Sequence, residues 1–244
     1  IVVDNGSKEP LQLHADQRYP DFEFIIIEAK LPFTWANNLG ISHAVKNHQA
    51  DYFLLLNSDT VAEEDFLVHL YRALKDNPKA GIAGSKIYFH RGFEYHHKSY
   101  RRDQRHQVLW YAGGSIDWEN LVSFHRGVDE VDRGQFDFQT TSDFVTGCSL
   151  MIKREVTERV GILDKRFFLY SEDVDYSLRV SKAGYQVLFV PKSIVWHKIG
   201  QSSGGAGSKL QQYYQTRNRL LLTFTHGSLR AKLAALRLIT RWIK

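Results

Sequence analysis

The chain has 244 residues, of which 43% are hydrophobic and 24% are charged, proportions typical of a folded globular protein. This composition excludes a disordered, collagen-like or coiled-coil protein, and no apolar run approaches the roughly 18 residues that a membrane-spanning helix needs. The one cysteine, Cys148, cannot form an internal disulfide, which excludes a disulfide scaffold and favours a reducing compartment.

The net charge of +5 conceals an uneven distribution. Residues 1–175 carry 20 Lys and Arg and all 27 Asp and Glu, whereas residues 176–244 carry 12 Lys and Arg and no acid. A basic segment beside an acidic body indicates a polyanionic partner, such as phosphate groups, nucleic acid or an anionic membrane.

The first third of the chain alternates between apolar runs and helical patterns. In chain order we expect a strand at 1–4, a strand at 22–28, a helix at 37–48, a strand at 52–56, a helix capped by Thr60 and a strand at 81–87. This alternation predicts an α/β fold with a mostly parallel sheet, in which ligands bind beyond the carboxyl ends of the strands. Polar turns at Asp4 and at 57–59 lie at two of these ends.

Residues 88–140 differ, because they are rich in His, Arg, Tyr and Trp and have no long periodic segment. We expect short strands around 110–114 there, separated by long loops. The expected elements after this region are a helix at 153–160, a helix at 172–183 closed by Gly184, a strand at 185–190 ended by Pro191, a Gly/Ser loop at 202–208, and helices at 209–225 and 229–243.

Two acidic motifs are candidates for chemistry. Asp59, in the turn Asn57-Ser58-Asp59, follows a strand, where a carboxylate can hold a divalent metal bound to a diphosphate; the alternative is a turn whose aspartate caps the next helix. Three carboxylates lie close together at the start of a helix: Glu172, Asp173 and Asp175. Their mutual repulsion raises the pKa of a carboxylate and the helix N-terminus lowers it, which can adjust the pKa for a general base. The alternative is the ordinary enrichment of acidic residues at a helix N-terminus.

Basic and imidazole side chains near the C-terminus suit an anionic ligand. His197 lies just beyond a strand and would complete a metal site with Asp59 if the fold brings them together. Arg217 lies on a helix and suits bidentate contact with phosphate, although, taken alone, it is better explained as a plain surface arginine. Residues 229–244 form a basic amphipathic helix, which fits either a membrane surface or a terminal helix docked on the domain.

The order of these motifs is more specific than any one of them. The segments IVVDNGS, NNLGI, LLLNSDT, WYAGG, DFVTGCSLMIKREV, RVGILDKRFFLYSEDVDYSLRVSKAGY, VPKSIVWHK and YYQTRNRLL follow one another along nearly the whole chain. Together they resemble the inverting glycosyltransferases of family two, and among these the bacterial rhamnosyltransferase-like branch. The block 143–198 carries the most specific part of the resemblance.

The resemblance implies a GT-A fold and a nucleotide-sugar donor linked to dTDP or UDP, with dTDP-rhamnose favoured. Asp173 would be the catalytic base beside Glu172. The resemblance assigns donor contacts to Asp4, Gly6, Ser7, Asn38, Asn57, Asp59 and Arg217. It assigns acceptor contacts to Trp110, Gly147 and Cys148.

A divalent metal, Mn²⁺ or Mg²⁺, would be held by Asp59 and His197. Asn57 stands where the family's metal motif has its first acid, which leaves one carboxylate in place of two. Relatives also have a strand and loop before the motif that here starts at Ile1, and without them we expect weaker donor binding.

These implications give a division of the chain and a set of partners. Residues 1–205 would form an N-terminally incomplete GT-A catalytic domain and residues 206–244 a basic helical segment. The acceptor would be a glycan or a lipid-linked glycan of bacterial cell-surface polysaccharide synthesis. We expect a cytoplasmic protein, peripheral on the inner face of the membrane through 229–244.

Two other functions remain open. A non-catalytic nucleotide-sugar-binding or scaffolding relative is favoured by Asn57 and opposed by the intact Glu172–Asp173 pair. A nucleic-acid-binding protein is suggested by the basic final third, but no nucleic-acid motif accompanies the charge, so we expect no nucleic-acid partner. The histidines and arginines of residues 90–106 have no assigned role.

Overall fold

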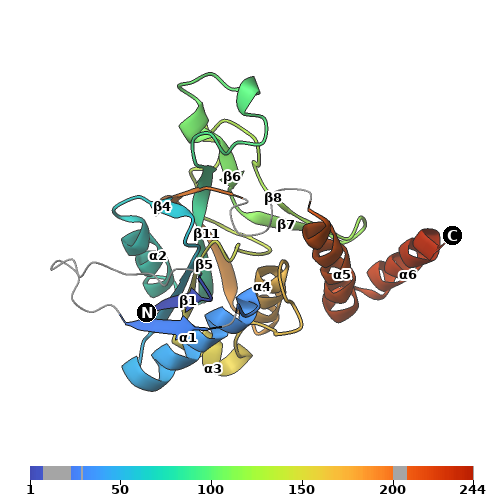
Figure 1. Cartoon of the computed structure of the whole chain (residues 1–244), viewed down its shortest axis with the longest axis horizontal. Coiled ribbons are helices and arrows are strands. Elements are labelled where there is room, and N and C mark those ends of the chain that lie inside the picture. The colour runs from blue at the N-terminus through green and yellow to red at the C-terminus, as the bar shows by residue number, and fades with distance from the viewer. Residues whose placement is uncertain (8–22, 29, 200–207, 244) are drawn as a thin grey trace.

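The computed structural model describes residues 1–7, 23–28, 30–199 and 208–243. Figure 1 shows a body of sheet and helices, from which residues 88–140 project on one side and two C-terminal helices on another. These helices are α5 (Lys209–His226) and α6 (Leu229–Ile243), and both match the helices predicted from the sequence.

The body is built on one mixed sheet. Its strands are hydrogen-bonded in the order β3 (Tyr52–Leu56), β10 (Ser149–Lys153), β5 (Ala80–Phe89), β11 (Gln186–His197) and β4 (Thr60–Ala62). Two short strands extend it, since β6 (Leu109–Tyr111) pairs with β5 and β9 (Thr140–Thr141) pairs with β11. Strand β5 is buried along its whole length and is therefore the centre of the core.

Helices cover both faces of this sheet. On one face, Leu70 and Leu74 of α2 (Phe66–Lys75) pack with Ala83 and Met151. On the other face lie α1 (Phe33–His48), α3 (Arg154–Val160) and α4 (Glu172–Lys182). Their apolar side chains share a cluster with Ile82 of β5, next in sequence to Ala83, as the alternation of side chains along a strand requires.

The predicted α/β class is confirmed, but the prediction of a mostly parallel sheet is wrong. Only the pair β5–β11 is parallel in the large sheet, and β1 (Val2–Asn5) pairs in parallel with β2 (Phe24–Ile27) in a separate small sheet. Strand β10 runs antiparallel to both of its neighbours, β3 and β5. The chain enters β10 after the long excursion through 88–140, so the order of elements along the sequence does not reveal this insertion.

Two predicted boundaries are also wrong. The helix expected at Thr60 begins instead at Phe66, because residues 60–62 form β4, whose Thr60 pairs with His197. Pro191 does not end a strand: β11 continues to His197, and Pro191 falls in the irregular stretch of its pairing with β5 between Val190 and Ile194. Proline has no backbone N–H to donate, so it is tolerated in this irregular stretch.

The other predicted elements are found within a few residues of their predicted ends, except that α1 starts at Phe33 and not at Asn37. Gly184 has φ +92°, as the predicted helix end requires. The Gly/Ser loop predicted at 202–208 lies, apart from Ser208, outside the described residues. Among the described helices, none combines the length and the apolar character that crossing a bilayer would require.

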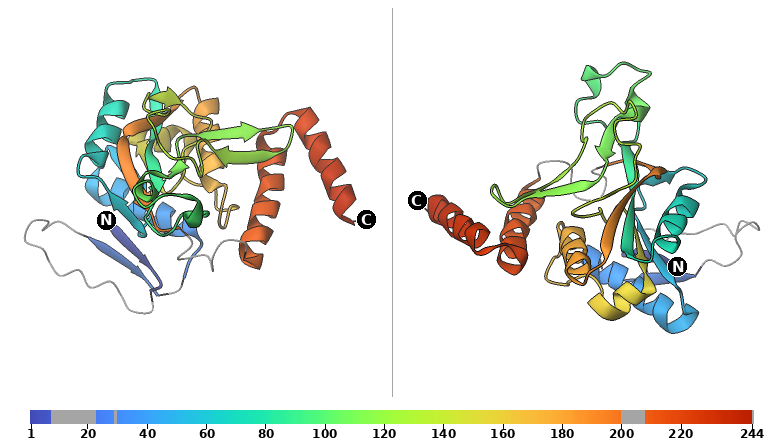
Figure 2. Two further views of the ribbon diagram at one scale, coloured as in Figure 1. Left: turned by 90° about the horizontal axis from the view of Figure 1, so that it is seen from above. Right: turned by 180° about the vertical axis from the view of Figure 1, so that it is seen from behind.

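The WYAGG segment leads into a hairpin that joins the body to the C-terminal helices. A Cβ on Gly114 would lie 2.4 Å from the Phe144 ring, so only glycine allows β7 (Gly114–Asp117) to pass this ring. Leu121, which connects β7 to β8 (Val122–His125), is buried against Ala231 and Ala235 of α6. Figure 2 shows this ribbon reaching from the body to α5 and α6.

A buried asparagine fixes α1 against the loop before α4. The Asn38 amide donates to the Leu163 carbonyl oxygen at 2.8 Å and accepts from the Leu163 N–H at 3.0 Å. The side chain is 3% exposed, so its bonds to Leu163 are shielded from solvent. Removing it leaves two buried backbone groups without partners.

We therefore expect Asn38→Ala to lower the free energy of unfolding by about 2–4 kcal/mol. Asn37→Ala is the matched control, because the Asn37 amide only donates to the Phe33 carbonyl oxygen within the same helix and should cost less than about 1 kcal/mol. Urea unfolding of the three proteins measures the difference. Equal costs for the two variants would contradict the role of Asn38.

Candidate functional site

A carboxylate and an imidazole meet at the carboxyl end of the sheet. His197 Nε2 lies 3.1 Å from Asp59 Oδ1 and 3.5 Å from the Asn57 amide nitrogen. The fold brings them together because β4 pairs with the end of β11, and Lys198 N–H donates to the Asp59 carbonyl oxygen at 2.8 Å. Thr60 Oγ1 donates to the Asn57 carbonyl oxygen, which closes the turn between β3 and β4.

These side chains fit a divalent metal. Ligands bound to one ion at about 2.0–2.2 Å lie roughly 3 Å apart, which is the spacing of Asp59 Oδ1 and His197 Nε2. Rotation of the Asn57 amide would offer an oxygen as a further ligand. Nδ1 of His197 is buried and has no hydrogen-bond partner among the described residues, so Nε2 is the nitrogen that faces the site.

Aromatic packing holds the His197 ring in place. Trp110 lies edge-on to it, with ring centroids 4.6 Å apart, and packs equally closely on His125. Burial lowers the pKa of His125 to about 4, so this imidazole is neutral at physiological pH. Trp110, assigned to the acceptor by the resemblance, thus lies against the Asp59–His197 pair.

The second acidic motif begins α4. Asp173 Oδ2 accepts from the Gly147 N–H at 2.9 Å, and Oδ1 accepts from the Val174 N–H at 2.8 Å. Burial, and then the charge of Asp173, raises the pKa of Glu172 to about 8, and one Glu172 carboxyl oxygen has no hydrogen-bond partner in the part of the chain that the structure describes. Burial also raises the pKa of Asp173, but the N–H groups of Gly147 and Val174 and the Thr146 hydroxyl oppose this rise. For Glu172 one backbone hydrogen bond opposes both burial and the charge of Asp173, so the pair carries its negative charge on Asp173 at neutral pH.

The backbone before α4 is strained and is held by α5. Tyr170 and Ser171 have φ of 70° and 66°, a left-handed conformation that is uncommon outside glycine. The buried Asn218 amide donates to the carbonyl oxygens of Leu169 and Tyr170, at 2.8 and 2.7 Å. Asn218 therefore positions the start of α4 and with it Asp173.

The sequence did not reveal this role of Asn218. Asn218 follows Arg217 in the segment YYQTRNRLL, but nothing in this local pattern shows that the asparagine is buried against the loop before α4. Arg217 donates to the Arg166 carbonyl oxygen at 3.0 Å and to the Asn218 side-chain oxygen at 2.6 Å. In this structure Arg217 thus supports the same loop, and contact with a diphosphate stays a prediction.

The turn 146–148 lies between the two acidic motifs. The Cys148 carbonyl oxygen accepts from the Asn57 N–H at 3.0 Å, while the Gly147 N–H donates to Asp173. The Cys148 side chain is 3% exposed, and burial, with the nearby charges of Asp59 and Asp173, raises the pKa of its thiol. The Cys148 side chain packs in an apolar cluster, and contact of this residue with the acceptor stays a prediction.

The predicted donor contacts at the N-terminus lie on the small sheet. Asp4 is buried on β1, and its Oδ1 accepts from the Ser7 N–H at 3.0 Å. Gly6 has φ +74° in the turn between them. Their contact with a nucleotide stays a prediction. Contact of Asn38 with the donor also stays a prediction, and in this structure Leu163 occupies both ends of the Asn38 amide.

Residues 90–106, which had no assigned role, pack on a turn of the same projecting region. The Tyr100 hydroxyl donates to the carboxylate and carbonyl oxygens of Asp129, and His96 Nδ1 contacts the same carboxylate.

The division of the chain into a catalytic domain ending at 205 and a helical segment starting at 206 stays a prediction. Leu222 of α5 belongs to the central apolar cluster, which joins this helix closely to the body.

The pKa of Glu172 generates a test of the charge assignment. Since the folded-state pKa lies near 8 and the ordinary value is 4.5, the native state holds a proton that the unfolded chain releases, and stability is lost as pH rises through this window. We expect Glu172→Gln to remove this loss. As the pH rises from 5 to 8, the free energy of unfolding of the variant, relative to that of the wild type, should increase by up to about 1.4 kcal/mol per pH unit.

Urea unfolding at several pH values measures this gain. Glu64→Gln, at an exposed position, is the control, and its free energy of unfolding should change with pH as that of the wild type does. If the free energy of unfolding of Glu172→Gln also changes with pH as that of the wild type does, Glu172 is ionised in the native protein and the charge assignment is contradicted.

Similar proteins include two curated rhamnosyltransferases. The N-acetylglucosaminyl-diphospho-decaprenol L-rhamnosyltransferase of Mycobacterium tuberculosis is 27% identical over 215 residues, covering 84% of this chain and 67% of the relative. The dTDP-rhamnosyl transferase RfbF of Shigella flexneri is 26% identical over 232 residues, covering 91% of this chain and 69% of the relative.

Two solved structures share the fold. GalNAc-T7 with UDP, GalNAc and Mn²⁺ aligns with a TM-score of 0.61 at 17% identity, covering 91% of this chain and 40% of that protein. The mannosyltransferase PcManGT from Pyrobaculum calidifontis, with GDP-Man and Mn²⁺, aligns at 0.53 and 12% identity, covering 91% and 53%. The chain therefore spans about two thirds of those curated relatives and about half or less of these structures, and its fold is of the GT-A type.

The family model described as Glycosyltransferase like family 2 matches residues 1–222, which include the Asp59–His197 pair, the turn 146–148 and the start of α4. The match covers most of the chain and all of the candidate site. The chain belongs to this glycosyltransferase family.

Proposed function

We propose that this protein transfers a sugar, with inversion, from a nucleoside-diphosphate donor to a hydroxyl of a glycan or lipid-linked acceptor in cell-surface polysaccharide synthesis. The observation that carries the proposal is the arrangement of Asp59 with His197 on one side of the turn 146–148 and Asp173 on the other. One side suits a diphosphate and the other suits a proton acceptor. The names of two relatives favour transfer of rhamnose, and one of these names specifies dTDP-rhamnosyl transfer; UDP-linked hexoses are the alternative donors.

The proposed reaction uses Asp173 as the general base. Its carboxylate takes the proton of the acceptor hydroxyl, and the oxygen forms a bond to the anomeric carbon. The bond from this carbon to the diphosphate oxygen breaks on the opposite face, so the configuration inverts. Gly147 and Val174 hold the carboxylate through their N–H groups, and Glu172 keeps its own proton, so the base carries the charge of the pair.

The leaving diphosphate gains negative charge as the bond breaks. Asp59 and His197, with the Asn57 amide, would hold Mn²⁺ or Mg²⁺ beside it, and such an ion supplies charge neutralisation. Mn²⁺ accepts mixed imidazole and carboxylate ligands, and it accompanies the nucleotide or nucleotide sugar in both similar structures.

We expect Asp173→Asn to lower the rate of sugar transfer by at least about 100-fold, because the amide cannot accept the proton. Donor binding should stay within a few-fold of the wild type, since Asp173 lies across the turn from the Asp59–His197 pair. Calorimetry with the nucleotide and a product assay separate the two effects. Asp76→Asn, at an exposed carboxylate after α2, is the control and should keep both.

Equal loss of transfer and of donor binding in Asp173→Asn would contradict the role of Asp173. A non-catalytic nucleotide-sugar-binding relative is the alternative function. It predicts that the wild type binds the nucleotide but neither transfers the sugar nor slowly hydrolyses the donor without an acceptor.

We also propose that α6 lies on an anionic membrane surface that carries the acceptor. Its small residues, including Ala231 and Ala235, dock on the hairpin, while Leu229, Leu233 and Leu236 are 75%, 47% and 50% exposed. Exposed arginines flank these leucines on the same helix. Exposed large apolar side chains beside basic ones favour a helix that lies in the headgroup region.

We expect the double variant Arg230→Glu with Arg237→Glu to weaken binding to phosphatidylglycerol vesicles by about tenfold or more, since each cation near such a surface contributes about 1 kcal/mol. Vesicle sedimentation at low salt measures this binding. The double variant Arg72→Glu with Lys75→Glu on exposed positions of α2 changes the charge equally and should bind like the wild type. Equal weakening in both would leave only a general charge effect and contradict the role of α6.

A further inference from the structure

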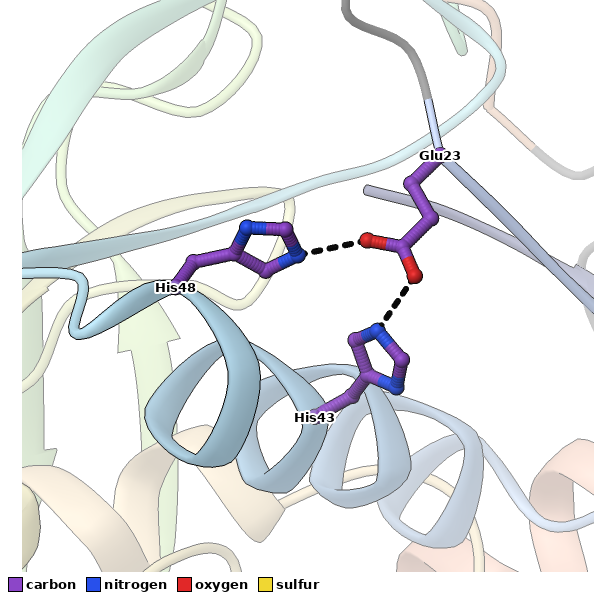
Figure 3. Close-up of side chains that lie close together, drawn as sticks. All are labelled: Glu23, His43 and His48. Carbon is purple, nitrogen blue, oxygen red and sulfur yellow. Dashed lines mark hydrogen bonds and ion pairs between the residues drawn. The ribbon is translucent and has the colours of Figure 1, made fainter.

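We propose that Glu23, His43 and His48 form a binding site for a divalent transition metal such as Zn²⁺, separate from the site around Asp59 and His197. Figure 3 shows the Glu23 carboxylate between the two imidazole rings, with one oxygen directed at each. His43 Nε2 lies 2.6 Å from one oxygen, and His48 Nε2 lies 2.5 Å from the other. One ligand atom from each of the three residues can be chosen so that all lie within 4.8 Å of one another.

The residue types and the spacing both fit zinc. Two imidazoles and one carboxylate are a ligand set that zinc takes in proteins, with a fourth position left for water. Bonds of about 2.0–2.2 Å in a tetrahedral arrangement place ligand atoms about 3.3 Å apart. The present contacts would have to widen by less than about 1 Å, which rotation of exposed or half-buried side chains permits.

The place of the cluster in the fold gives the metal a structural effect. Glu23 immediately precedes β2, and its carbonyl oxygen accepts from the Val2 N–H of β1 at 2.8 Å. Both histidines belong to the second half of α1, and a Cβ on Gly40 of that helix would lie 3.0 Å from a Val3 methyl group. A metal bound by Glu23, His43 and His48 would therefore link the small β1–β2 sheet to α1 and stabilise their packing.

The side chain of Asn47 supports the geometry. Its amide nitrogen lies 3.1 Å from Nδ1 and 3.0 Å from Nε2 of His43. When Nε2 binds a metal, Nδ1 carries the proton, and the Asn47 amide can turn its oxygen toward it. Such a partner fixes the tautomer and the orientation of a ligating histidine.

The test is a Zn²⁺ titration of the full chain against a chromophoric chelator of known affinity. We expect the wild type to hold a Zn²⁺ equivalent that the double variant His43→Gln with His48→Gln loses or binds about tenfold or more weakly. His197→Ala should keep this equivalent, which separates it from any metal held at the Asp59 site. His96→Gln is the matched control, because His96 contacts one carboxylate, that of Asp129, as part of a pair and not of a triad.

Thermal unfolding supplies a second readout that is independent of stoichiometry. Excess Zn²⁺ should raise the Tm of His197→Ala, which lacks the imidazole of the Asp59 site, and leave unchanged the Tm of a chain that carries His43→Gln and His48→Gln in addition, since a ligand that binds the native state stabilises it. Equal Zn²⁺ affinity in the double variant and the wild type would overturn the proposal. Loss of the equivalent in His197→Ala instead would overturn it as well.

Discussion

The turn 146–148 is fixed by two hydrogen bonds, and the positions of both acidic motifs depend on them. The Gly147 N–H donates to the Asp173 carboxylate at the start of α4, and the Cys148 carbonyl oxygen accepts from the Asn57 N–H at the end of β3. Strand β10 begins directly after this turn and lies between β3 and β5. The same segment therefore determines both the position of β10 in the sheet and the geometry of the site.

Packing remote from the turn completes the arrangement. β11 reaches the site because it runs past Pro191 to His197, where β4 pairs with it and carries Asp59 nearby. On the other side, Asn218 of α5 stabilises the left-handed Tyr170 and Ser171 before α4. Strain of this kind persists only where surrounding contacts hold it, and it commonly marks a functional site. Helix α5 is thus part of the site's support, in addition to carrying basic charge.

The sequence predicted what local patterns determine and missed what depends on distant contacts. Apolar runs and helical spacing located most elements, and the rule that ligands bind at strand ends led to the pairing of Asp59 with His197. The antiparallel insertion of β10 could not be predicted, because it pairs with strands that lie about 60 to 100 residues earlier in the chain. The role of Asn218 and the triad around Glu23 were missed for the same reason, since each joins segments that are distant in the sequence.

Calorimetric titration with dTDP and with UDP, each with and without Mn²⁺, tests the central claim that Asp59 and His197 form a metal-dependent diphosphate site. One nucleotide should bind the wild type at least about tenfold more tightly with Mn²⁺, a gain of about 1.4 kcal/mol, and His197→Ala should lose that gain. The same affinity with and without Mn²⁺, or an undiminished gain in His197→Ala, would contradict the claim.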